Sequence, residues 1–199
     1  MGVLVFILAV LPLAGGYNMY LMKAESPGPS VGKLVPKVKS TAKILYGIYF
    51  FMTVVEILLL LAGGMPLFDS LATGFGTAGT GGFGIKNSSI AYYDSYYLQG
   101  VITVFMILFG INFNVYYLFL VHHPKDALRC EEARVYLGII GVTVLLITLN
   151  IRGSFTSLFA AFHHAAFQVA SIITTTGFST VDFDKWPEFS KGLLVVLMF

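Results

Sequence analysis

The sequence predicts an all-α membrane protein in which a helix, a re-entrant pore helix, a filter-like turn and a second helix recur around a pore. Three observations predict this fold class. Apolar residues make up 57% of the 199 residues and charged residues only 11%, against about a quarter in soluble domains. Apolar runs of about 20 residues, the length that crosses a bilayer, recur along the chain. Two similar turns, Thr80–Gly84 and Thr175–Ser179, follow apolar segments that are shorter than this.

The first 40 residues predict one span and one loop. Val3–Met22 is apolar, whereas Glu25–Ser30 contains two prolines, which do not continue a helix. We expect residues 1–40 to be the last helix of a preceding repeat with a cytoplasmic loop. Because the chain starts and ends inside apolar runs, we also expect it to be a piece of a longer protein.

Residues 41–128 predict a complete repeat. Lys43–Leu61 is long enough to span and closes at two glycines. A half-helix from about Pro66 to Ala78 is too short to cross, and we expect it to lead into the first turn. The polar loop 86–97 then connects to a third span, Leu98–Val121.

Residues 129–199 predict a second helix, pore loop and helix, truncated in its last helix. Val135–Ile151 is a short span, and Ser154–Ile173 repeats the half-helix. After the second turn, Val181–Lys191 repeats the polar loop, and Gly192–Phe199 opens a fifth span.

The basic residues predict the orientation. Eight of the twelve Lys and Arg fall in two places, which the positive-inside rule puts in the cytoplasm: Lys23, Lys33, Lys37, Lys39 and Lys43, and Lys125, Arg129 and Arg134. A half-helix that crossed fully would separate these loops, so both turns are expected on the outer side. The formal charge of +2 does not suggest nucleic acid as a partner, and the single cysteine, Cys130, excludes an internal disulfide.

The two turns carry the predicted chemistry. Non-helical backbone is tolerated at membrane depth only inside protein or beside a watery cavity. Carbonyl rings that replace the hydration shell of an ion follow the pattern Thr, any residue, Gly, aromatic, Gly; the first turn fits it, and the second fits all but its last place. Close helix packing is the alternative role for such glycines. The predicted ion-filter residues are Thr80, Gly81, Gly82, Phe83, Thr175, Thr176, Gly177 and Phe178.

Two other groups are candidates for function. Glu56 lies in the middle of a span, where a carboxylate is costly, and either a buried structural hydrogen bond or a role in ion passage would explain it. His163 and His164 are adjacent on a predicted helix, so they point in different directions and are poorly placed to chelate one metal.

Four stretches of the sequence resemble the pore subunit of the Trk/Ktr/HKT family of potassium transporters. The stretches are Ala24–Pro29, Thr80–Phe83, Gly110–Phe113 and Ala166–Phe178, and the similarity extends over almost the whole chain. The resemblance implies four helix–pore loop–helix repeats around one pore, of which this chain would hold the end of the first, all of the second and most of the third.

The resemblance also implies a function. It implies uptake of K⁺, the transported ion, with the carbonyls of Thr80, Gly81, Thr175 and Thr176 as ligands and Gly82 and Gly177 as the selective glycines. It further implies a multi-pass protein of the bacterial plasma membrane, a homodimer surrounded by lipid, and a cytoplasmic nucleotide-binding regulatory subunit of the TrkA or KtrA type. No organic cofactor, enzymatic activity or nucleic-acid partner is expected. The gating loop of the family would lie beyond Phe199.

Two alternatives remain open from the residues. A substrate-binding secondary transporter also uses interrupted helices, although its repeats are often inverted, whereas the charge pattern here makes both copies parallel. An intramembrane enzyme built on His163, His164 and a serine such as Ser171 lacks an evident pairing of nucleophile and base.

Overall fold

The structure, a computed structural model, describes residues 38–112, 115, 116, 118 and 130–198. The chain divides into two compact units, one of Met1–Met52 with Asn112–Arg134 and one of Thr53–Ile111 with Val135–Phe199. The two turns, the short helices and the contacts between them lie in the second unit. The predicted first span and most of both basic loops fall outside the described residues, and the division into 1–40, 41–128 and 129–199 stays a prediction.

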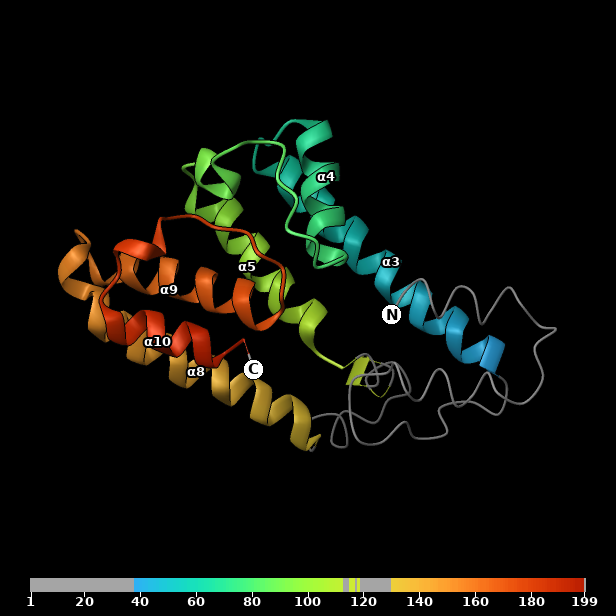
Figure 1. Ribbon diagram of the computed structural model, residues 1–199. Helices are drawn as coiled ribbons and strands as arrows, with labels where there is room; N and C mark the ends of the chain where they lie inside the picture. Colours follow the sequence, from blue (N-terminus) through green and yellow to red (C-terminus); the bar gives the residue numbers. More distant parts are fainter. Residues whose placement is uncertain (1–37, 113–114, 117, 119–129, 199) are drawn as a thin grey trace. The chain divides into compact units, whose positions relative to one another are not determined.

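The regular elements of the described residues are all helical, as predicted. In chain order they are α3 (Val38–Ala62), α4 (Leu67–Ala78), η1 (Ser89–Tyr92), α5 (Tyr96–Gly110), α8 (Glu131–Ile151), η2 (Arg152–Ser154), α9 (Leu158–Ile173), η3 (Phe183–Lys185) and α10 (Glu188–Val196) (Figure 1).

Two stretches among the described residues are long and apolar enough to cross a membrane. They are Ile44–Ala62, with 19 residues and a mean hydropathy of 2.3, and Glu131–Ser154, with 24 residues and a mean hydropathy of 1.9. In contrast, the 12 residues of α4 and the 16 of α9 reach only about 18 and 24 Å at 1.5 Å per residue, less than a bilayer core of about 30 Å. The lengths agree with the prediction that α4 and α9 are re-entrant.

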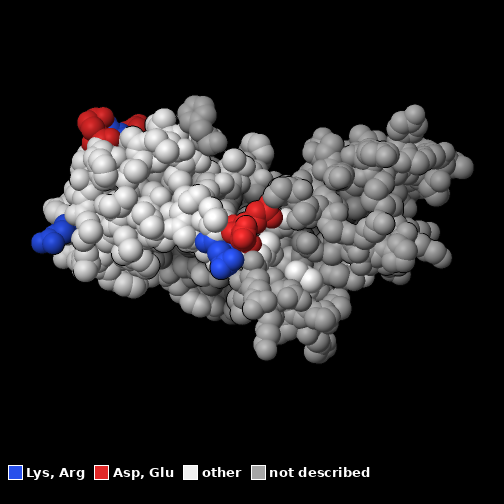
Figure 2. Space-filling view, turned by 90° about the horizontal axis from the view of Figure 1, so that it is seen from below, with Lys and Arg blue, Asp and Glu red and all other residues white. Residues whose placement is uncertain are grey.

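The outer surface of the long helices is apolar. On α8, Val142, Leu145 and Leu149 are about 60% exposed, at 59%, 60% and 61%. Large exposed apolar patches are unusual in proteins that face water, but hydrocarbon accepts them. On the face that Figure 2 shows, Lys, Arg, Asp and Glu gather in a few small groups, and the described surface between them is uncharged. This surface suits contact with lipid.

The core lies between α5 and α9, which cross and pack against each other (Figure 1). One apolar cluster joins α5 to the region around the second turn through Ile102, Met106, Phe167 and Phe178. Gln99 adds a polar tie, because its side-chain oxygen lies 2.9 Å from Nε2 of His163 on α9. A second cluster joins α8, α9 and α10 and includes Ile147, Val169, Trp186 and Leu194. These contacts fix α9 and, with it, the start of the second turn.

Helix boundaries differ from the predicted ones where capping or charge extends or shortens an apolar run. α9 begins at Leu158, not Ser154, because the Ser157 hydroxyl accepts a hydrogen bond from Ala160 N at 3.1 Å. α8 begins at Glu131, four residues before the predicted span, since carboxylates are favourable in the first turn of a helix. α10 likewise begins at Glu188, inside the predicted polar loop.

α5 also ends earlier than predicted. The sequence predicts a third span over Leu98–Val121, whereas α5 stops at Gly110 and Ile111 is extended. At Gly110 a Cβ would lie 2.3 Å from the Tyr136 hydroxyl and 2.9 Å from Cγ2 of Thr174. Close approach of α8 and the second turn therefore explains why a glycine, a weak helix former, stands where the helix ends.

Candidate functional site

The two turns leave their short helices in the same way. α4 ends at Ala78 and α9 at Ile173, 95 positions later, which is also the spacing of Gly82 and Gly177. The three amides after each helix donate to the same relative carbonyls. These bonds are Gly79 N to Phe75 O, Thr80 N to Thr77 O and Gly81 N to Gly76 O in the first copy, and Thr174 N to Ala170 O, Thr175 N to Ile172 O and Thr176 N to Ser171 O in the second.

The backbone conformation repeats as well. Thr80 and Thr175 have φ of 48° and 56°, and Gly82 and Gly177 have φ of 63° and 88°, whereas the residue between them is not left-handed in either turn. Positive φ at a β-branched residue is a real outlier, and such strain gathers at functional sites. The sequence pattern of the turns is therefore matched by a shared, strained geometry.

The two turns also touch each other. A Cβ built on Gly82 would lie 1.9 Å from the carbonyl oxygen of Thr176 and 3.2 Å from the carbonyl carbon of Gly177. Only a residue without a side chain lets the two backbones approach this closely. Gly81, Thr175 and Gly177 are exposed, so part of each turn remains accessible.

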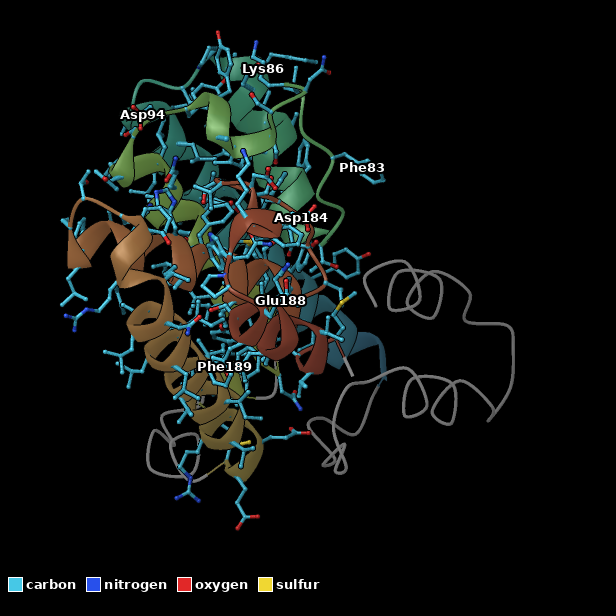
Figure 3. All side chains as sticks on the ribbon, turned by 60° about the vertical axis from the view of Figure 1, so that its left-hand side comes forward. Phe83, Lys86, Asp94, Asp184, Glu188 and Phe189 are labelled. Atoms are coloured by element: carbon cyan, nitrogen blue, oxygen red, sulfur yellow. The ribbon has the colours of Figure 1, made fainter. Side chains whose placement is uncertain are left out.

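The two phenylalanines of the turns differ in their surroundings. Phe83 is 84% exposed and extends away from the helices (Figure 3). Phe178 is fully buried, and its ring tip lies 3.1 Å from where a Cβ on Gly76 of α4 would be. Its carbonyl oxygen accepts a hydrogen bond from the Ser171 hydroxyl at 2.6 Å. Phe178 thus packs the second turn against α4, the short helix of the first copy.

Polar side chains tie each short helix to the loop after its turn. In the first copy the Tyr93 hydroxyl donates to Asp69, and Lys86 Nζ lies 3.7 Å from the same carboxylate. Burial, and then the bond to Asp69, raise the pKa of Tyr93, so the phenol keeps its proton. In the second copy, Nδ1 of His164 lies 3.0 Å from the Thr180 hydroxyl. His164 stands 95 positions after Asp69.

The sequence pattern did not predict that Asp69 would bond Tyr93 and Lys86, or that Thr180 would bond His164. A signal was present, because the same 95-residue spacing that pairs the two turns also pairs Asp69 with His164. From the sequence, His164 is a candidate only for a metal ligand or a catalytic base. Among the described residues no group of three His, Cys, Asp or Glu is placed to hold a metal ion.

Ser171 is engaged elsewhere than in a catalytic pair. Its hydroxyl donates to the Phe178 carbonyl, while His163 bonds Gln99 and His164 bonds Thr180. A serine nucleophile needs a base within hydrogen-bond reach. The arrangement therefore gives no support to the enzyme alternative.

Glu56 lies fully buried on α3, close to the Thr77 hydroxyl of α4. Thr77 donates instead to the Thr73 carbonyl at 2.9 Å, and neither carboxylate oxygen of Glu56 makes a well-formed hydrogen bond within the described part of the chain. A buried carboxylate without a partner destabilises the fold.

We expect Glu56→Gln to leave the thermal midpoint of the detergent-solubilised protein unchanged or to raise it. The amide has almost the same shape and removes the cost of burying an unpaired acid. Thr148→Val on α8 is the control for a change of polarity alone, because the buried Thr148 hydroxyl has no hydrogen-bond partner within the described residues. A clear fall in the midpoint for Glu56→Gln would show that the carboxylate has a partner and contradict this prediction.

Together, the short helices, the paired strained turns and the apolar outer surface define a class, the helical membrane proteins in which helix–turn segments too short to span a bilayer alternate with longer helices. The family of TrkH, described as a cation transport protein, matches residues 1–160. The chain belongs to this family, as the resemblance predicted.

Curated relatives and a solved structure agree with the family. The Trk system potassium uptake protein TrkH of Salmonella typhimurium (strain LT2) is 34% identical over 203 residues, covering 100% of this chain and 42% of the relative. TrkH of Halomonas elongata is 35% identical over 207 residues with the same coverage. The crystal structure of the potassium transporter TrkH from Vibrio parahaemolyticus has a TM-score of 0.79 and 31% identity, covering 98% of this chain and 40% of that one. The chain thus spans about two fifths of the length of its relatives.

Proposed function

We propose that the complete protein carries potassium ions into the cell through a pore whose selective segment includes both Thr-Gly turns. One observation carries the proposal: the turns meet at Gly82 and Thr176. A carbonyl cage can replace the water around an ion only if its turns face one another at close range. Membership of the cation transport family, and relatives described as potassium uptake proteins, support the same reading.

In this proposal each part of a turn has its own task. The carbonyls of Thr80, Gly81, Thr175 and Thr176 coordinate the ion. Gly82 and Gly177 take the left-handed backbone conformation that the turn requires. Phe83 and Phe178 flank the turns, and the burial of Phe178 supports a role in holding the backbone still.

The proposal extends to the setting of the protein. We place it in the bacterial plasma membrane as a multi-pass protein, with the turns outside, the basic loops in the cytoplasm and lipid against the exposed faces of α3 and α8. The family resemblance supports a homodimer with a cytoplasmic nucleotide-binding subunit of the TrkA or KtrA type. Two turns surround only part of an ion, so this segment alone is not expected to conduct.

Rubidium uptake tests the function. The complete protein that contains this segment is expressed in a host that lacks its own potassium uptake systems, and ⁸⁶Rb⁺ entry is followed against K⁺ and Na⁺ as competitors. We expect saturable entry that K⁺ inhibits strongly and Na⁺ weakly. Absence of entry despite normal amounts of protein in the membrane would reject the proposal.

A further inference from the structure

The loop between the first turn and α5 is anchored at one end to α4. Asp69, in the first turn of α4, is 7% exposed and accepts a hydrogen bond from the Tyr93 hydroxyl. The Lys86 ammonium lies 3.7 Å from the same carboxylate and 4.9 Å from the centre of the Tyr92 ring. Lys86, which is labelled in Figure 3, is two residues beyond Gly84, so this anchor fixes the chain directly after the first turn.

The same loop is joined to the end of the second turn. Ser179 N donates to the Ser89 hydroxyl at 3.2 Å, and Ala91 N donates to the Ser179 carbonyl at 3.1 Å. Both backbone groups of Ser179 are therefore satisfied by the first copy. Ser89 has a φ of 54°, a strained conformation for a residue with a side chain, and this conformation accompanies its bond to Ser179.

Apolar packing also connects the loop to the second turn. Ile90 is 2% exposed and belongs to the apolar cluster that contains Phe178. The tie of the second copy, His164 to Thr180, stays within that copy. Among the polar contacts between the two copies, those of Ser89 and Ala91 hold Ser179 at the end of the second turn, whereas the contact of Gln99 with His163 connects α5 with α9.

From these contacts we infer that residues 86–93 form an outer brace, which sets the position of the second turn relative to the first and thereby tunes ion selection. Asp69 and Ser89 are positioning residues of this brace, acting through the backbone and not by touching the ion. The inference rests on the proposed function, because it assigns the brace to the same ion path.

Ser89→Ala in the complete protein tests the brace. It removes the acceptor for Ser179 N but keeps a Cβ at the same strained φ, so only the hydroxyl is lost. We expect KM for ⁸⁶Rb⁺ to rise, and inhibition by Na⁺ to strengthen, each roughly three- to ten-fold, the scale of one hydrogen bond, while Vmax per membrane-inserted protein changes little. Ser89→Asn, which tolerates left-handed backbone and offers an oxygen, is expected to restore part of the selectivity.

Matched variants distinguish a specific effect of the brace from a general loss of folding. Ser88→Ala changes the neighbouring exposed serine, which makes no capping bond, and should match the wild type. Asp69→Asn releases Lys86 at the other end of the brace and should shift KM and Na⁺ inhibition in the same direction as Ser89→Ala. Asp184→Asn makes the same change at an exposed carboxylate and should leave KM and Na⁺ inhibition unchanged.

Failure of the brace differs from failure of the function. If the wild type shows no selective uptake, the proposed function is wrong. If the wild type is selective and both Ser89→Ala and Asp69→Asn behave like their controls, the brace is overturned and the proposed function stands.

Discussion

Replacing Gly82 by serine is expected to abolish potassium-selective uptake and to lower the amount of folded protein. The residue has a φ of 63°, and a Cβ there would lie 1.9 Å from the Thr176 carbonyl oxygen. The obstacle is backbone, which cannot rotate aside as a side chain could. The two turns must therefore separate, which breaks the contact on which the proposed carbonyl cage depends. Competition of Na⁺ with ⁸⁶Rb⁺ uptake, normalised to protein in the membrane, measures the effect.

Gly177→Ser is the matched comparison, because it changes the equivalent glycine without a clash. The φ of Gly177 is 88°, but no atom beyond its two chain neighbours lies within 4 Å of the position that a Cβ would take. The cost is then only the left-handed strain, about 1–2 kcal/mol. We expect normal amounts of protein with weakened discrimination against Na⁺. Equal loss in the two variants would argue against the close contact at Gly82, and wild-type selectivity in both would contradict the filter assignment.

The short helix and turn of the first copy could be predicted closely from the sequence. α4 starts one residue after Pro66 and ends at Ala78, as expected, because a proline and glycines mark its two ends. The turns could be predicted because their residue pattern occurs twice. Here the determinants are local, so the sequence displays them directly.

What could not be predicted depends on distant partners. Phe83 and Phe178 both follow a glycine in the same pattern, yet one is exposed and the other fully buried. The difference lies in whether another copy's helix packs alongside, which the pattern does not contain. Likewise, Ser89 gains its role from Ser179, 90 residues away. The helix starts at Glu131 and Glu188 were not predicted. An apolar run marks only the part of a helix that would lie in lipid, and the helix can extend beyond that run into polar residues.

Phe178→Ala is expected to cost about 3–5 kcal/mol in the free energy of unfolding, as other buried Phe→Ala changes do. The ring is fully buried and packs against α4 at Gly76. Its removal leaves a cavity between the two copies, which neither lipid nor the rigid helix backbone readily fills. Thermal unfolding of the complete protein in detergent measures the loss.

Phe83→Ala is the control for this prediction, since it removes the same ring from the equivalent position of the first turn. At 84% exposed, Phe83 packs little against the described residues, and we expect a change within about 0.5 kcal/mol. The contrast isolates packing from the chemistry of the aromatic ring. A loss at Phe83 as large as that at Phe178 would mean that another part of the complete protein covers Phe83, as α4 covers Phe178. Equal and small losses would mean that the contact at Gly76 does not hold the second turn.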